Sequence, residues 1–173
     1  MPDALGLERT TVALRLYDER WAKLFQEERA RLQGVLSDDV LAIEHIGSTA
    51  VPGLTAKPIL DVGVAVADFE AAFALVPRLE GLGYTFRGEQ GIPRRHYFVQ
   101  GADTKRTHHL HMLEHTNPEW RDLLGFRDRL RAQPETAKAY ETLKRQLAKE
   151  HPNDREAYTN GKVEFVRAVL DRA

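Results

Sequence analysis

Residues Glu44 to Val66 read E-H-I-G-S-T-A-V-P-G-L-T-A-K-P-I-L-D-V-G-V-A-V, and this stretch decides the fold. A short apolar run, Leu41 to Ile46, meets a Gly-Ser-Thr turn. A Lys-Pro pair then leads into a second apolar run that contains a single acid, Asp61. A lone carboxylate buried in a strand is costly unless it is paired, hydrogen-bonded or bound to a metal. We therefore expect Asp61 to have a function.

The rest of the chain predicts more strands in the middle and helices at both ends. The two apolar runs, 41–46 and 59–66, are typical of buried strands, with a turn or short helix at 48–54 between them. Further strands are expected at 84–87, 95–99 and 107–114. Helices are expected at 18–34, from 68 to about 81 with a kink or a helix start at Pro77, and at 117–131, 134–151 and from 153 or 154 onwards. This order predicts an α+β fold, a mixed β-sheet packed with helices and a helical C-terminal third.

Composition limits the classes of partner and site. The chain of 173 residues is expected to form a single domain, 1–173, because this length can bury a full core. Its 25 Lys and Arg balance 26 Asp and Glu, so we expect neither nucleic acid nor a membrane as partner. There are no cysteines, so any metal must be bound by His, Asp, Glu or backbone oxygen. With no signal peptide pattern and no apolar segment near the ~20 residues that span a bilayer, the cytoplasm is the expected location.

Alternation along the strands predicts a polar centre on one face of the sheet. Asp61 and Gly63 share a face of their strand, as do His109 and His111 of theirs. Adjacent strands would present a carboxylate and two imidazoles to one spot, where they could hold a divalent ion. An H-x-H pair alone is more often a solvated strand feature, and a Gly-Ser turn alone is common. The combination with an acid thirteen residues after Ser48 is more specific.

A Gly-Ser turn after one strand and an acid on the next resembles the nucleotidyltransferase fold of the DNA polymerase β-like superfamily. The resemblance implies that the turn at Gly47 and Ser48 binds triphosphate oxygens through backbone N–H and hydroxyl groups. The superfamily's usual motif is Asp-x-Asp/Glu, whose two carboxylates bind paired magnesium ions. In this chain Gly63 stands at the second position, and a departure of this kind weakens the binding of hard cations.

The longer stretch is similar to the hallmark of the GrpB-like family, also called UPF0157. The similarity runs from about Tyr17 to the C-terminus and includes G-I-P-R-R-H-Y-F, T-H-H-L-H-M, F-R-D-R-L-R and N-D-R-E-A-Y-T-N-G-K. It implies the nucleotidyltransferase-like fold. The family also occurs fused to dephospho-CoA kinase, which implies a place in nucleotide metabolism, but the resemblance implies no established reaction.

Other polar residues have weaker indications. Lys57 precedes the Asp61 strand and is expected to supply a positive charge to phosphate oxygens. Arg95 is expected to reach the cleft from the neighbouring strand, because it and Arg94 point to opposite faces. Cations on the C-terminal helices, such as Lys144 and Lys162, are expected at the surface more than at a cleft rim.

We therefore expect a cleft that binds a nucleotide or a nucleotide-containing cofactor and, as an enzyme, transfers a nucleotidyl group. One divalent ion, magnesium, manganese or zinc, would assist. Two alternatives remain open: a catalytically inactive nucleotide-binding module, and a His/Asp metallohydrolase that does not use the Gly-Ser turn. The candidate site residues are Asp61 and His111 for catalysis, Gly47, Ser48, Thr49, Lys57 and Arg95 for substrate binding, and Asp61, His109 and His111 for metal binding.

Overall fold

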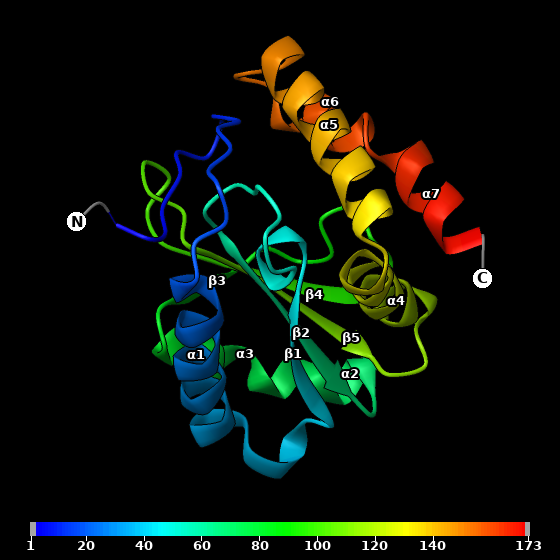
Figure 1. Ribbon diagram of the computed structural model, residues 1–173. Coiled ribbons are helices and arrows are strands. Elements are labelled where there is room, and N and C mark those ends of the chain that lie inside the picture. The colour runs from blue at the N-terminus through cyan, green and yellow to red at the C-terminus, as the bar shows by residue number, and fades with distance from the viewer. Residues whose placement is uncertain (1–2, 172–173) are drawn as a thin grey trace.

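The structure, a computed structural model, describes residues 3–171 and has a five-stranded mixed sheet at its centre (Figure 1). Its strands are β1 (Ala42–Ile46), β2 (Leu60–Val66), β3 (Tyr84–Phe86), β4 (Arg95–Gln100) and β5 (His108–Glu114), in the spatial order β1-β2-β5-β4-β3. Strands β2 and β5 are parallel, and the other neighbouring pairs are antiparallel. The predicted α+β fold with a mixed sheet is therefore confirmed.

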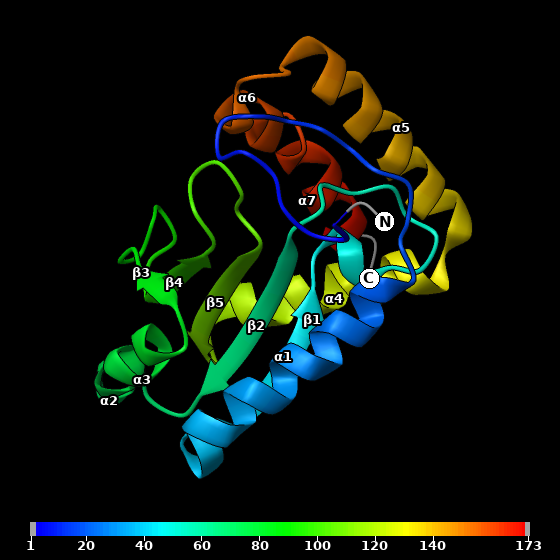
Figure 2. The same cartoon turned by 90° about the vertical axis from the view of Figure 1, so that its left-hand side faces the viewer.

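Helices cover both faces of the sheet (Figures 1 and 2). One face carries α1 (Arg20–Leu36), α2 (Phe69–Ala72) and α3 (Val76–Gly81), and the other carries α4 (Pro118–Ala132). The chain continues through α5 (Pro134–Glu150), α6 (Arg155–Asn160) and α7 (Val163–Asp171), of which α5 and α7 pack against α4. Among residues 3–171, no helix is both long and apolar enough to cross a bilayer.

Alternation of side chains gives the sheet one apolar face and one mixed face, which is apolar under α4 and polar at Asp61. Val62 and Val64 of β2, together with Leu110 of β5, are fully buried in the main core beneath α1. On the opposite face, Leu113 of β5 packs with Trp120 of α4. Asp61 lies one residue from the start of β2 and, by the period of two, points to the α4 face.

The register of the strands brings the predicted polar residues side by side. In the parallel pair of β2 and β5, Asp61 lies opposite His109 and Gly63 lies opposite His111. In the antiparallel pair of β4 and β5, Tyr97 lies opposite His111. The carboxylate, both imidazoles and the Tyr97 ring therefore leave the same face of the sheet from three neighbouring strands.

The final helix differs from the prediction, because two helices, α6 and α7, replace the single one expected. The break lies at Gly161, where a Cβ atom would be only 2.5 Å from Cδ2 of Leu147 on α5. A glycine at this point lets the chain approach α5 closely and turn. The segment after Asp68 is also divided, into α2, a 3-10 turn at Phe73–Leu75 and α3, with Pro77 in the first turn of α3 as one of the two predicted alternatives.

Candidate functional site

A cavity of about 330 Å³, the Asp61 pocket, opens on the mixed face of the sheet beside the Gly47-Ser48 turn. Strands β2, β4 and β5 form its floor, and residues of α4, α5 and α6 also contribute to its lining. The structure brings all of the predicted site residues to its wall; these are Gly47, Ser48, Thr49, Lys57, Asp61, Arg95, His109 and His111. Their convergence is observed, whereas their roles stay predictions.

The turn before η2 (Ser48–Ala50) lies directly against the Asp61 carboxylate. Gly47 has φ +71°, and a Cβ atom there would be 2.6 Å from Oδ2 of Asp61. Glycine is the residue that allows both this backbone conformation and this close approach. Any side chain at Gly47 would displace the acid.

Asp61 contacts both histidines through one oxygen. Its Oδ1 lies 3.4 Å from Nδ1 of His109 and 3.5 Å from Nε2 of His111. Burial opposes ionisation, but hydrogen bonding to the two imidazoles outweighs it and holds the pKa of Asp61 well below its usual range. An ionised carboxylate only accepts hydrogen bonds, so both nitrogens that face it carry protons.

This arrangement fixes the state of His109. Burial lowers the pKa of His109, in spite of its contact with Asp61, so the ring is neutral at neutral pH. Because Nδ1 carries the proton toward Asp61, Nε2 of His109 is an unprotonated acceptor. A carboxylate that orients Nδ1–H and leaves Nε2 free is the arrangement of a histidine general base.

His111 has the opposite tautomer, because Arg95 contacts its other nitrogen. Nη1 of Arg95 lies 3.1 Å from Nδ1 of His111. A guanidinium can only donate, so Nδ1 of His111 accepts and its proton is on Nε2, toward Asp61. Arg95 also donates to the carbonyl oxygens of Glu89 and Gln90, at 3.0 Å and 2.9 Å from Nη2, and so holds that loop beside the pocket.

These proton positions argue against the predicted three-ligand metal site. A metal-bound imidazole uses an unprotonated nitrogen while its other N–H donates to an acceptor. In this structure His111 faces a donor on one nitrogen and the Asp61 carboxylate on the other. Within the part of the chain that the structure describes, no group of three His, Cys, Asp or Glu side chains is arranged to hold a metal. The predicted metal set of Asp61, His109 and His111 stays a prediction.

The place of the missing second carboxylate is filled by α4. A Cβ atom at Gly63 would lie 2.9 Å from Cζ3 of Trp120 and 3.4 Å from Cγ2 of Ile46. An Asp or Glu side chain needs this same space. The two-carboxylate, two-magnesium site of the superfamily therefore does not fit here while Trp120 is in place.

Two further lysines belong to the site, although the sequence favoured surface positions for them. Lys144 of α5 is only 1% exposed and donates to Oγ of Ser48 at 3.1 Å and to the Thr55 carbonyl. Lys162 lines the pocket, and its Nζ lies 4.4 Å from the centroid of the Tyr158 ring. A signal for Lys144 was present, because it follows Tyr140 by four residues on the buried stripe of α5.

The pocket concentrates positive charge. Burial lowers the pKa of Lys57 to about 8 and that of Lys162 to about 7, and the repulsion between these two lysines adds to the effect at Lys162. Burial likewise lowers the pKa of Lys144 to about 7, with Lys57 contributing. A bound polyanion would favour the charged form of all three lysines.

These lowered pKa values predict that the stability of the protein rises with pH. Between about pH 7 and about pH 9, the unfolded chain binds more protons than the folded one at Lys57, Lys144 and Lys162. The free energy of unfolding therefore increases with pH over this window. Closer to pH 10 the effect is opposed, because burial raises the pKa of tyrosines such as Tyr97 and Tyr140. Urea unfolding of the wild type and of Lys162→Met at several pH values measures the effect, with a smaller rise expected in the variant. If the free energy of unfolding of the wild type stays constant or falls with pH over this range, the pKa values of the three lysines are not lowered by burial.

The Thr49 side chain is buried and hydrogen-bonded inside the protein, so it is poorly placed to contact a ligand. Its hydroxyl lies 2.9 Å from Nε2 of His45, whose ring stacks on Phe25 at 4.6 Å. Burial lowers the pKa of His45 to about 4, so this histidine is neutral. Ser48 is therefore the better candidate for a hydroxyl contact with phosphate.

Glu44 has a structural role, because its carboxylate pairs with Arg127 of α4 at 2.7 Å.

The amino-acid chain is similar to proteins of a known family. The profile of the family described as GrpB protein matches residues 11–172. The UPF0157 protein YqkA of Bacillus subtilis is 44% identical over 162 residues, and the glutamate-rich protein GrpB of Alkalihalophilus pseudofirmus is 35% identical over 171 residues. The matches cover 94% and 96% of this chain, but 47% of YqkA and 98% of the second relative, so the chain spans about half the length of YqkA.

A solved structure supports the same assignment. The crystal structure of the conserved protein GrpB from Enterococcus faecalis superposes with a TM-score of 0.85 at 38% identity, covering 92% of this chain and 96% of that one. The sequence resemblance to the GrpB-like family is confirmed by these findings. The chain belongs to the GrpB protein family.

Proposed function

We propose that the Asp61 pocket binds a nucleotide or a nucleotide-containing molecule through its phosphates and transfers a nucleotidyl group. The observation that carries the proposal is the convergence of Lys57, Lys162 and the Gly47-Ser48 turn at the wall of the Asp61 pocket, with the buried Lys144 donating to Ser48. Phosphate oxygens are the ligands that such a set of ammonium, hydroxyl and backbone groups binds best.

Each group has a role in holding the phosphates. Lys57 and Lys162 supply positive charge from the pocket wall. The Ser48 hydroxyl accepts from Lys144, and its own proton can be donated either to the neighbouring Tyr140 oxygen or to a phosphate oxygen. Arg95 acts as a positioning residue in this proposal, because its guanidinium is occupied by His111 and by the carbonyls of the 89–90 segment.

The transfer step uses His109 and Asp61. An acceptor hydroxyl loses its proton to Nε2 of His109 as its oxygen bonds to the α-phosphorus, and the bond from that phosphorus to the bridging oxygen breaks to release pyrophosphate. Asp61 keeps the His109 ring in the required tautomer and stabilises the imidazolium that forms. The lysines neutralise the negative charge that builds up on the phosphate oxygens.

One observation favours a second candidate, a nucleotide-binding module without chemistry. Trp120 occupies the space in which a second carboxylate would stand, so the usual magnesium chemistry of the superfamily has no room at Gly63. The third class, a His/Asp metallohydrolase, has less support, because the contact of Arg95 with His111 does not suit a metal ligand.

A thermal-shift screen tests the binding proposal. The panel holds nucleotides and coenzyme A precursors, each with and without magnesium, manganese and zinc. Specific binding to the folded state raises the unfolding midpoint by mass action, equivalent to about 2.7 kcal/mol at a ligand concentration of a hundred times Kd. Lys162→Met is expected to lose most of the shift, and the control Lys149→Met, an equal change of charge at an exposed site on α5, is expected to keep it. No shift across the panel, or equal shifts in both variants, would contradict the proposal.

A further inference from the structure

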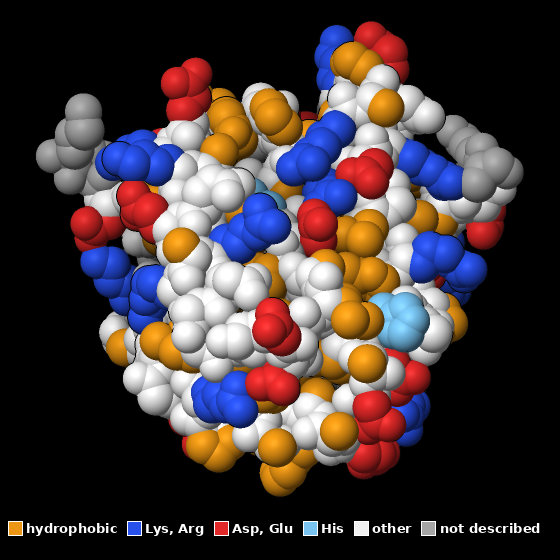
Figure 3. Space-filling model, turned by 90° about the horizontal axis from the view of Figure 1, so that it is seen from below, with side chains coloured by type: hydrophobic (Ala, Val, Ile, Leu, Met, Phe, Trp, Pro, Cys, Tyr) orange, Lys and Arg blue, Asp and Glu red, His pale blue; other side chains and the backbone are white. Residues whose placement is uncertain are grey.

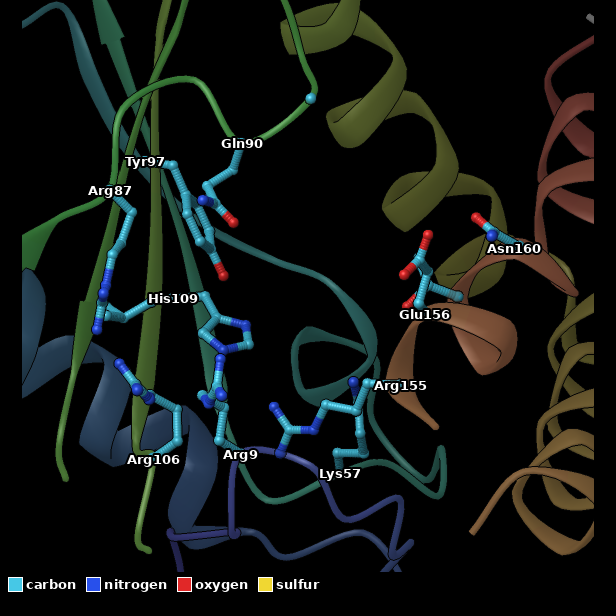
Figure 4. Close-up of a pocket in the computed structure, with 13 residues that line it drawn as sticks. Arg9, Lys57, Arg87, Gln90, Tyr97, Arg106, His109, Arg155, Glu156 and Asn160 are labelled. Atoms are coloured by element: carbon cyan, nitrogen blue, oxygen red, sulfur yellow. The ribbon is translucent and has the colours of Figure 1, made fainter. Parts of the chain in front are cut away.

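A second cavity, the basic chamber, adjoins the Asp61 pocket. It has a volume of about 860 Å³ and shares Lys57, His109 and Thr159 with the pocket. In Figure 4 the basic side chains of its wall surround the same space as the His109 ring, and Glu156 of α6 lies across that space. The two cavities therefore meet at the histidine whose Nε2 is an acceptor.

The wall of the basic chamber carries many more cations than carboxylates. Its basic residues are Arg9, Lys57, Arg87, Arg106 and Arg155. Its acidic lining residue is Glu156. Asp103 offsets part of this charge from the side, pairing with Arg9 at 3.7 Å and with Arg106. The chamber keeps a clear excess of positive charge after this pairing.

Two of the arginines have no carboxylate partner among residues 3–171, and one of them, Arg155, is also held in place. Arg155 donates to the carbonyl oxygens of Thr11, at 3.0 Å, and Glu8, at 2.8 Å, so its charge is fixed in position but not neutralised. Arg87 is exposed and takes part in none of the ion pairs of the described chain. A positive group that is pre-positioned, as Arg155 is, binds an anion with little loss of conformational entropy.

Arg106 is a further fixed cation of the wall. Its side chain is only 4% exposed, and its Nη2 pairs with Asp103. Its Nε is buried without a hydrogen-bond partner among the described residues. The Arg106 charge is therefore held at the chamber by the packing around it and is only partly offset by the exposed Asp103.

We infer that the basic chamber is a second anion site, which binds a polyphosphate group of at least two negative charges beside the Asp61 pocket. This inference stands on the charge and shape of the chamber and does not depend on the proposed transfer reaction. Two sources of such a group fit: the distal phosphates of a nucleotide in the pocket, or a separate phosphorylated molecule. In either case the bound phosphates lie next to His109 at the junction.

Calorimetric titration of the full chain with pyrophosphate tests this inference. The wild type is expected to bind, with an affinity that falls as salt rises. Arg87→Gln should weaken binding about threefold to tenfold, as expected for one partly screened charge. Glu156→Gln should strengthen binding by a similar factor, and a gain of affinity cannot result from misfolding. Arg29→Gln, at an exposed position of α1, is the matched control for net charge and should bind as the wild type does.

The same titrations separate this inference from the proposed function. A nucleoside monophosphate tests the Asp61 pocket without polyphosphate, and Arg87→Gln should not change its affinity. If the monophosphate binds but pyrophosphate does not, or if all three variants bind pyrophosphate alike, the chamber inference is overturned while the pocket proposal survives. If a nucleoside triphosphate excludes pyrophosphate and Arg87→Gln weakens the binding of both, the distal phosphates of the nucleotide occupy the chamber. If both bind together, a separate phosphorylated molecule is the occupant.

Discussion

Asp61→Asn is expected to lower the rate of nucleotidyl transfer by at least about a thousandfold, by analogy with loss of the orienting aspartate in a Ser-His-Asp triad. Oδ1 of Asp61 faces protonated nitrogens of His109 and His111 at 3.4 and 3.5 Å. An asparagine can place its oxygen where Oδ1 lies and keep both contacts, but it carries no negative charge. The imidazolium that forms on His109 when it takes the proton of the acceptor hydroxyl would then have no carboxylate to stabilise it.

Nucleotide affinity should remain equal or become tighter in Asp61→Asn, because a negative charge leaves a pocket that binds phosphate. Single-turnover experiments measure the loss of rate, and calorimetric titration measures the retained nucleotide affinity. Asp38→Asn, at an exposed position in the 3-10 segment Ser37–Asp39, serves as the control and should change neither quantity. If Asp61→Asn binds nucleotide but the wild type shows no turnover to lose, the protein is a binding module. If the variant keeps the full rate of an active wild type, Asp61 has no catalytic role.

His109→Gln is expected to lower the rate about a hundredfold to ten-thousandfold with little change in nucleotide affinity, which is the usual contribution of a general base. In the wild type, burial keeps the pKa of His109 below the ordinary 6.5, so activity should fall only on the acidic side of that value. The acidic limb of the pH–rate profile should disappear in His109→Gln. A structural role for His109 would not remove this limb.

His111→Gln is the matched comparison on the same strand. Its ring holds Asp61 through Nε2 and accepts from Arg95 through Nδ1, so it positions the acid and does not accept a proton from substrate. We expect a smaller loss of rate and a retained acidic limb. The reverse order, with His111→Gln losing the limb and His109→Gln keeping it, would contradict the assignment of the base and return His111 to its predicted catalytic role.

The polar part of the mixed face could be predicted from the sequence because it depends on short-range rules. Alternation placed Asp61 and Gly63 on one face of β2, and His109 and His111 on one face of β5. The same rule placed Arg94 and Arg95 on opposite faces but did not select between them. Arg95, the residue chosen, does line the pocket, while Arg94 is exposed and pairs with Glu114. Strand order was not needed for these predictions, only adjacency.

The proton positions and the basic chamber could not be predicted in this way. That Arg95 contacts Nδ1 of His111 depends on rotamers and on the pairing of β4 with β5. The chamber combines Arg9, Arg87 and Arg155, which lie in three distant segments with no shared pattern. The break between α6 and α7 depends on a tertiary contact of Gly161 with Leu147, which local helix propensity does not report.

A crystal structure with a bound non-hydrolysable nucleoside triphosphate would show whether the Asp61 pocket holds phosphate. We predict phosphate density between Ser48, Lys57 and Lys162, on the Asp61 side of the sheet, with the triphosphate extending toward the basic chamber. Density for the nucleotide at any other surface, or a pocket that stays free of nucleotide at saturating concentration, would overturn the proposed phosphate site.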